Sequence, residues 1–251
     1  MRIKIFIFIL ISQFAFAQTT YVPDDNFEQA LIDLGYDDTL DDYVLTANIS
    51  GVTSLDVSVK EISDLTGIED FTALTELVCY NNYLTSLDLS ANTALNILEG
   101  NYNQLTSLGV SANTALTTLR CNHNQLTSLD VSANTALTTL DCSGNQLTSL
   151  DVSANTALTN LQCNENQLIH LNMKNGVTDQ LTDFNATNNS LTCIEVNADD
   201  IDYATENWTS GNDNIDEGVG FSVVCAPEGY TYVPDDNFEQ ALIDLGYDDV
   251  L

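Results

Sequence analysis

The chain has 251 residues, of which 37 are acidic and five basic, so its formal net charge at pH 7 is −32. Such a surface repels nucleic acid and anionic lipid, because binding to either depends on cationic side chains that displace counterions. The composition therefore excludes a nucleic-acid partner. It favours solubility, and it tolerates cationic partners and divalent metal ions.

Residues 1–17, MRIKIFIFILISQFAFA, have the features of a secretory signal peptide. Arg2 and Lys4 supply the positive start, and the apolar run 5–11 is too short to cross a bilayer. Ala15-Phe16-Ala17 fits the small-x-small cleavage pattern. We therefore expect a secreted or outer cell-surface protein that begins at Gln18, with no transmembrane segment in the mature chain.

Residues 18–51 are expected to form an N-terminal cap that contains a helix. In VPDDNFEQALIDLG, Asp24 or Asp25 can cap the start of the helix and Gly35 can end it. Phe27, Leu31 and Leu34 share the i, i+4, i+7 spacing of one helix face. We expect this apolar face to cover the first coil of the region that follows.

Residues 52–192 repeat with a period of about 21 residues, in the pattern L-x-x-L-x-C-x-x-N-x-L-x-x-L-D-V-S-A-N-T-A. L-x-C and L-x-V alternate with period two, so each repeat predicts two strand-like segments with Leu and Cys or Val facing inward. One repeat cannot bury its apolar side alone, but stacked repeats share a continuous core. Seven coils are expected, at Leu55, Leu77, Leu98, Leu119, Leu140, Leu161 and Phe184.

An asparagine recurs five residues after the first-strand leucine, and its amide can bridge successive turns, since it holds two donors and two acceptor sites. We interpret these residues as a structural asparagine ladder: Asn82, Asn103, Asn124, Asn145, Asn166 and Asn189.

The repeat resembles that of bacterial extracellular leucine-rich repeat proteins. The nested 21-residue unit is similar to IRREKO repeats, and VTSLDVSVKEISDLTGIEDFTALTEL at 52–77 is similar to internalin-type repeats. Gly100 and Ala186 depart mildly from the pattern, because they occupy the cysteine slot. The resemblance implies a curved solenoid of parallel β-rich coils that binds partners, usually proteins, and no shared chemistry.

The six cysteines fall into two groups. Cys79, Cys121, Cys142 and Cys163 occupy an inward slot, where we expect free, buried thiols that act as small hydrophobic residues. A one-sided row of thiols gives no tetrahedral metal site. Cys193 and Cys225 lie outside the repeat, and in an exported protein they predict a disulfide that closes a C-terminal cap at 193–229, with Trp208 and Phe221 covering the last coil.

The segment TYVPDDNFEQALIDLGYDD at 20–38 recurs identically at 231–249. We therefore expect 230–251 to be the start of a second, truncated module, within a longer protein of tandem modules.

The outward residues of the second segments are nearly constant Ser and Asp, whereas those of the first segments vary from coil to coil. A face that only needs solvation can be copied unchanged, so we place a partner-binding face on the variable side. Its candidate residues are Glu76, Val78, Tyr80, Ile97, Glu99, Asn101, Thr118, Arg120, Asn122, Asp141 and Gln162. Val78, Tyr80 and Ile97, with nearby Tyr83 and Tyr102, form its apolar part, and aromatic side chains suit contact with protein or sugar.

We expect a non-catalytic module that binds a protein. The alternatives are a structural spacer or adhesin stalk of tandem modules, and a glycan-binding module. The two histidines, His123 and His170, have no evident nucleophile partner, and no catalytic motif is present. No cofactor is expected. The row Asp88, Asp130 and Asp151 could attract calcium, but it lacks the clustered loop of a strong site, so a solvated acidic edge is favoured.

Overall fold

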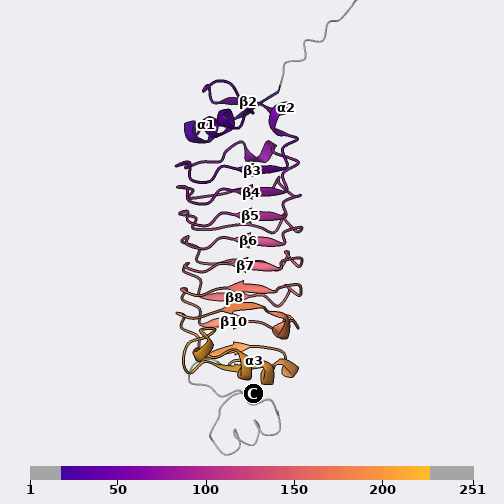
Figure 1. Cartoon of the computed structure of the whole chain (residues 1–251), viewed down its shortest axis with the longest axis vertical. Coiled ribbons are helices and arrows are strands. Elements are labelled where there is room, and N and C mark those ends of the chain that lie inside the picture. The colour runs from indigo at the N-terminus through magenta and orange to yellow at the C-terminus, as the bar shows by residue number, and fades with distance from the viewer. Residues whose placement is uncertain (1–17, 227–251) are drawn as a thin grey trace, which may run out of the picture.

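The computed structural model describes residues 18–226, which form a stack of coils between two caps (Figure 1). The expected signal peptide at 1–17 and the expected second module at 230–251 lie outside the described residues, as do the last residues of the expected C-terminal cap.

The N-terminal cap pairs β1 (Thr19–Tyr21) antiparallel with β2 (Tyr43–Leu45) and adds α1 (Asp25–Asp33) and the short α2 (Thr46–Ile49). Asp24 caps α1, since its Oδ1 accepts hydrogen bonds from the backbone N–H groups of Asn26 and Phe27, each at 3.0 Å. The predicted start of this helix is therefore confirmed.

The predicted apolar face of α1 is correct for Phe27 and Leu31, which are fully buried, and wrong for Leu34, which is 46% exposed. The helix ends at Asp33 and Leu34 is its C-cap, so the chain turns before the third position comes over the core. Ala30 is buried in its stead. The ring of Phe27 lies 6.4 Å from that of Phe71 in the first coil, so the cap covers the solenoid as expected.

Seven parallel strands, one in each coil, form the main sheet and confirm the predicted number of coils. They are β3 (Ser54–Asp56), β4 (Glu76–Val78), β5 (Ile97–Glu99), β6 (Thr118–Arg120), β7 (Thr139–Asp141), β9 (Asn160–Gln162) and β11 (Asp183–Asn185). Each leucine pairs with the leucine of the next coil, as Leu77 does with Leu98, so equivalent residues form columns along the stack. Short 3₁₀ turns lie at Ile68–Asp70 and Thr178–Gln180.

The second segments pair as strands only towards the C-terminus, in the parallel sheet β8 (Ser149–Asp151), β10 (His170–Asn172), β12 (Cys193–Glu195) and β13 (Gly220–Ser222). In earlier coils the inward residues remain buried, as Val110 and Val131 are, although their segments form no strand. Inward burial requires only that the side chain faces the core, whereas strand pairing also requires the backbone groups of adjacent coils to meet.

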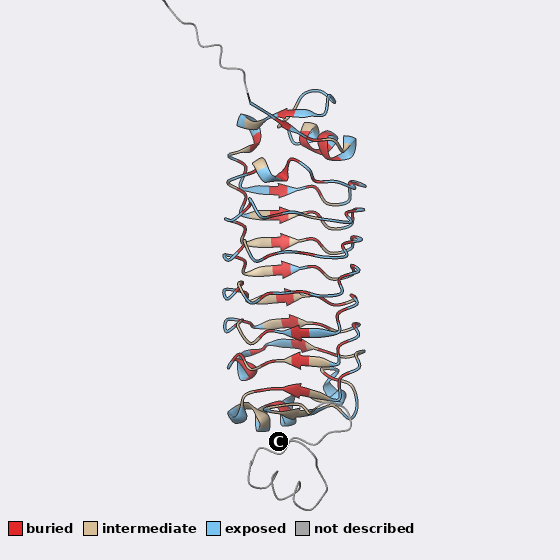
Figure 2. Ribbon diagram, turned by 180° about the vertical axis from the view of Figure 1, so that it is seen from behind, coloured by how far each residue is buried: buried red, intermediate tan, exposed pale blue. Residues whose placement is uncertain are grey.

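The core runs the length of the stack, with the buried central residue of each strand of the seven-stranded sheet shown in red in Figure 2. Cys79, Cys121, Cys142 and Cys163 are fully buried and free, as predicted for an inward slot. At Gly100, which takes this slot in the third coil, a Cβ atom would meet only Cys79 Sγ, at 3.8 Å.

The C-terminal cap contains α3 (Ile201–Asn207) and 3₁₀ turns at Ala198–Asp200 and Ser210–Asn212. The ring of Trp208, which is 4% exposed, lies 4.3 Å from Phe184 of the last coil and 5.8 Å from Phe221. Cys193 and Cys225 form the predicted disulfide.

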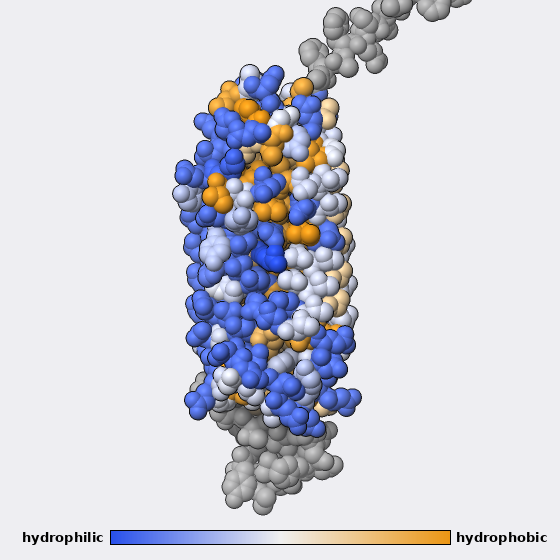
Figure 3. All heavy atoms as spheres, viewed as in Figure 1, coloured by the Kyte–Doolittle hydropathy of each residue, from blue (hydrophilic) through white to orange (hydrophobic). Residues whose placement is uncertain are grey.

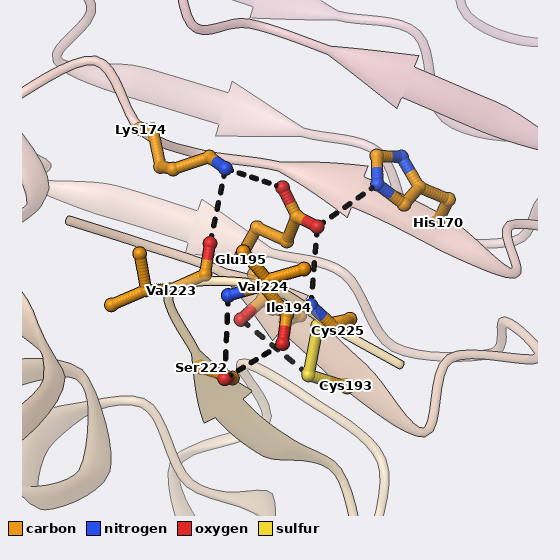
Figure 4. Close-up of a disulfide and its surroundings, with 9 residues drawn as sticks. All are labelled: His170, Lys174, Cys193, Ile194, Glu195, Ser222, Val223, Val224 and Cys225. Atoms are coloured by element: carbon orange, nitrogen blue, oxygen red, sulfur yellow. Dashed lines mark hydrogen bonds and ion pairs between the residues drawn. A yellow bond between two sulfur atoms is a disulfide. The ribbon is translucent and has the colours of Figure 1, made fainter. Parts of the chain in front are cut away.

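Glu195, on β12, holds the disulfide-bonded end against the coils (Figure 4). One carboxylate oxygen accepts from the backbone N–H of Cys225 at 3.1 Å, and the other lies 2.7 Å from Lys174 Nζ. Lys174 also donates to the carbonyl of Val223 at 3.0 Å. The cap is therefore fixed by a covalent bond and by a charged group beside it.

Candidate functional site

The outward side of the seven-stranded sheet, which we call the strand face, carries all the residues predicted for partner binding. Glu76 and Val78 lie on β4, Ile97 and Glu99 on β5, and Thr118 and Arg120 on β6. Each of these strands is followed, two residues beyond its end, by a further predicted residue: Tyr80, Asn101 and Asn122. These nine side chains come together on three adjacent coils. Asp141 and Gln162 lie one and two coils further along. All are half-buried except Arg120, which is exposed.

A hollow of about 600 Å³ lies within this group, at the ends of β4 to β6. We call it the aromatic hollow, and it is lined by Tyr80, Asn81, Glu99, Asn101, Tyr102 and Arg120. Four of its six residues belong to the predicted face, Tyr102 is the predicted neighbour of that face, and Asn81 is not among the predicted residues. In the view of Figure 3, hydrophobic surface gathers over the N-terminal cap and the first coils, at the top, and the surface of the later coils below them is mostly hydrophilic.

The Tyr102 wall of the hollow is held by a stack that spans three coils. The ring of Tyr102 lies 4.5 Å from that of His123, with 23° between their planes. His123 in turn lies against Gly144, where a Cβ atom would come within 2.6 Å of His123 Nδ1. Gly144 therefore leaves the space that lets the two rings lie flat on each other.

This stack occupies a column of left-handed backbone positions that precede the asparagine ladder. The φ angle is 55° at Asn81, 53° at Tyr102, 51° at His123, 62° at Gly144 and 55° at Glu165. Left-handed backbone disfavours residues with a bulky side chain and is tolerated by Gly and Asn. Asn188, with a φ angle of 56°, continues this column. Because its residues share no chemical type, the column could not be predicted from the sequence.

Arg120 donates to the carboxylate of Glu99 at the rim of the hollow. Of the five Lys and Arg residues of the chain, Arg2 and Lys4 precede the described part, which leaves three. Lys60 pairs with Asp33 of the N-terminal cap and Lys174 with Glu195 of the C-terminal cap. Arg120 is thus the one cation on the strand face among the described residues.

The asparagine ladder ties each coil to the one before it. Asn124, for example, donates from Nδ2 to the carbonyls of Cys121 in its own coil and Gly100 in the preceding coil, both at 3.0 Å. Its Oδ1 accepts from the N–H of Leu105 at 2.9 Å. The same pattern connects Asn103, Asn145, Asn166 and Asn189 to their neighbours.

A second column of asparagines, absent from the predicted ladder, runs along the other side of the core at Asn92, Asn113, Asn134 and Asn155, all fully buried. Asn113 Nδ2 donates to the carbonyls of Leu89 and Asn92 in the preceding coil, at 3.0 and 2.9 Å. The repeated S-A-N-T-A motif held the signal, since its Asn recurs with the same period as the first.

The acidic row on the second segments caps local turns. The Oδ1 atoms of Asp88, Asp130 and Asp151 accept from the N–H of the serine two residues on, at 3.0, 2.9 and 2.8 Å. The Ser90 N–H, and then its hydroxyl, hold the pKa of Asp88 below its ordinary value. Within residues 18–226 the structure brings no three His, Cys, Asp or Glu side chains into a group able to hold a metal ion.

The free thiols are buried, and each of the two histidines contacts a neighbouring side chain. Burial raises the pKa of the Cys79 and Cys163 thiols to about 12, so they stay protonated and poor nucleophiles at neutral pH. His123 is part of the ring stack, and His170 Nε2 lies 3.5 Å from Glu195. Across the described part of the chain, no helix is both long enough and apolar enough to cross a membrane.

Parallel strands at each coil, a leucine core and buried asparagine columns define the leucine-rich repeat fold. A segment of 73 residues is 41% identical to internalin J of Listeria monocytogenes and covers 29% of this chain but 8% of that protein. The solved functional domain of InlJ from Listeria monocytogenes, described as including a cysteine ladder, is 32% identical with a TM-score of 0.46, over 72% of this chain and 52% of that one. The matched part of this chain thus corresponds to about half of the length of the solved InlJ domain and to less than a tenth of the length of internalin J.

The ectodomain of the plant receptor kinase GASSHO1/SCHENGEN3 from Arabidopsis thaliana has the same fold, with a TM-score of 0.57 and 23% identity over 70% of this chain and 22% of that one. No family model matches the chain.

Proposed function

We propose that this chain is an exported, non-catalytic leucine-rich repeat module, secreted or held at the outer cell surface, and that it binds a protein through its strand face. The observation that carries the proposal is the set of varying, half-buried side chains that the register aligns on β4 to β6. Apolar Val78 and Ile97 lie on adjacent strands there, next to the aromatic hollow.

The charge of the molecule indicates the kind of partner. Acidic side chains surround the apolar residues, with Glu76 opposite Ile97 and Glu99 opposite Val78 in the sheet. A basic partner surface gains in association rate and in specificity from such a face. The solved receptor ectodomain is in complex with CASPARIAN STRIP INTEGRITY FACTOR 2, which illustrates ligand binding by this fold in that protein.

A matched pair of double variants tests the proposal. Val78→Lys with Ile97→Lys places two charges on the strand face, each beside a carboxylate, and Ser128→Lys with Ser149→Lys places two charges on the exposed second segments beside Asp130 and Asp151. Each immobilised protein is exposed to a surface-protein extract, and the retained proteins are compared by mass spectrometry. We expect a specific partner to be lost only with the strand-face variant, provided both variants keep the unsubstituted melting temperature.

The alternative role as a spacer or stalk predicts a different outcome. A spacer transmits length and stiffness, so neither double variant changes which proteins are retained. Equal retention by the two folded variants would therefore overturn the binding role of the strand face and favour the spacer.

A further inference from the structure

We propose that the aromatic hollow binds the ring of a neutral sugar. This inference uses the face assigned under the proposed function, but it concerns a separate ligand and is tested separately. Ligand sites are typically concave and largely apolar, with a few polar groups that fix orientation. The hollow has this composition, with Tyr80 and Tyr102 from adjacent coils beside the polar side chains of Asn81, Asn101, Glu99 and Arg120.

The rings supply the apolar contact. Tyr102 is 51% exposed, yet its stacking on His123, which rests against Gly144, holds the ring in a fixed orientation. A rigid aromatic side chain offers a large contact area at a low cost in conformational entropy. A pyranose has a face of C–H groups that packs against such a ring, and the volume of about 600 Å³ accommodates a ring of this size.

The polar groups match a ligand with several hydroxyls. Arg120 presents only donors and the Glu99 carboxylate only acceptors, and the two lie side by side on neighbouring strands. A hydroxyl can donate to Glu99 and accept from Arg120, so one class of ligand satisfies both residues.

Charge selects a neutral ligand over an ionic one. The Arg120–Glu99 pair is neutral as a whole, so an anion must compete with Glu99 for Arg120 and a cation must compete with Arg120 for Glu99. An anion is also repelled by a chain whose net charge is −32. A neutral polyhydroxylated ring can hydrogen-bond to both partners without separating them.

The site can be removed without removing the fold. Tyr102→Asn deletes one aromatic wall, and Asn is already the residue at the equivalent positions 81 and 188, with φ angles of 55° and 56°. Glu165→Asn is the matched control, because it also places Asn in the same left-handed column, three coils from Tyr102 and outside the hollow. Both variants should melt at or above the temperature of the unsubstituted protein.

Saturation-transfer NMR with the methyl glycosides of glucose, galactose, mannose and N-acetylglucosamine, and with sialic acid as the anionic comparison, tests the inference. We expect saturable transfer to the ring protons of at least one neutral glycoside, with a dissociation constant on the order of 1 mM. Tyr102→Asn should weaken this binding about tenfold, as expected for the loss of an aromatic contact, and Glu165→Asn should leave it unchanged.

Three results would overturn the sugar site: no saturable transfer from any neutral glycoside, a dissociation constant that Tyr102→Asn leaves unchanged, or transfer from sialic acid alone. Loss of protein capture in Tyr102→Asn without any sugar binding would assign the hollow to a side chain of the protein partner instead. Because protein capture is tested with the Val78 and Ile97 variants, either proposal can fail while the other holds.

Discussion

Asn124 shows how a single side chain holds two coils together. Its amide donates to Gly100 and Cys121 and accepts from Leu105, three backbone groups that lie in the core and have no water to bind. A buried backbone group without a hydrogen-bond partner costs about 1–3 kcal/mol, so the asparagine contributes mainly by preventing that cost. Leu, which is as large, could fill the space but could not bond these groups.

We expect Asn124→Ala to lower the free energy of unfolding by about 2–4 kcal/mol, because it leaves three backbone groups unsatisfied at once. Gln125→Ala, on the exposed neighbour, should change it by less than about 0.5 kcal/mol. Urea denaturation followed by circular dichroism measures both. Similar small losses in the two variants would mean that water or a rearranged backbone satisfies the groups, and that the ladder is not required for stability.

The sequence predicted such residues where periodicity and chemistry agree. Leu140, Cys142 and Asn145 recur at fixed offsets, so their inward direction follows from the sequence alone. The hollow was only partly predicted. Strand alternation predicts that Tyr80, Glu99 and Arg120 point outward. The direction of the Tyr102 side chain depends on a left-handed backbone conformation, which a tyrosine in the sequence does not indicate.

At the scale of elements, the two caps differ in which of their features can be predicted from the sequence and in the contacts that attach them to the coils. The start of α1 could be predicted to within one residue, at Asp24 or Asp25, since capping is a local property of the sequence, whereas the exposure of Leu34 depends on where the following turn leaves the core. The C-terminal disulfide was predicted from cysteine position. The contacts that Glu195 makes beside this disulfide could not be predicted, because nothing in the sequence relates Glu195 to Lys174 or Cys225.

Glu195 should make the C-terminal cap sensitive to acid. Burial raises the pKa of this carboxyl, but the hydrogen bonds from Lys174 and the Cys225 N–H, with the nearby charges of Lys174 and His170, bring it below its ordinary value of 4.5. A carboxyl whose pKa is lowered by folding stabilises the folded state above its unfolded pKa. That stabilisation is lost as the pH falls through the folded pKa.

Glu195→Gln should therefore be less stable than the unsubstituted protein at pH 7, and the difference should close as the pH falls from 4.5 towards the lowered pKa. Thermal melting of both proteins at each pH gives the difference directly. Glu217→Gln, in an exposed position of the same cap, is the control for removing one acid. A difference between Glu195→Gln and the unsubstituted protein that stays constant over this pH range would contradict the ionic role of Glu195.

At the scale of the whole molecule, cations are used sparingly. Two of the three in the described part lie at the caps, where Lys60 and Lys174 pair with acids, and the third lies at the aromatic hollow. The rest of the surface carries an excess of negative charge that repels itself. The total charge could be read from composition, but the placement of each cation needed the coil geometry, because Lys60 and Asp33 are brought together only by folding.

Salt should stabilise this molecule, and calcium should add nothing specific. The Asp88, Asp130 and Asp151 carboxylates already accept from serine N–H groups of their own turns, and successive acids lie on separate coils rather than around one centre. An ion that takes six or more oxygens needs a curled loop to supply them. We expect millimolar CaCl₂ to raise the melting temperature no more than NaCl of equal ionic strength, since screening is then the whole effect. A larger rise with calcium, abolished by Asp130→Asn with Asp151→Asn, would show native-state binding and make calcium a structural cofactor.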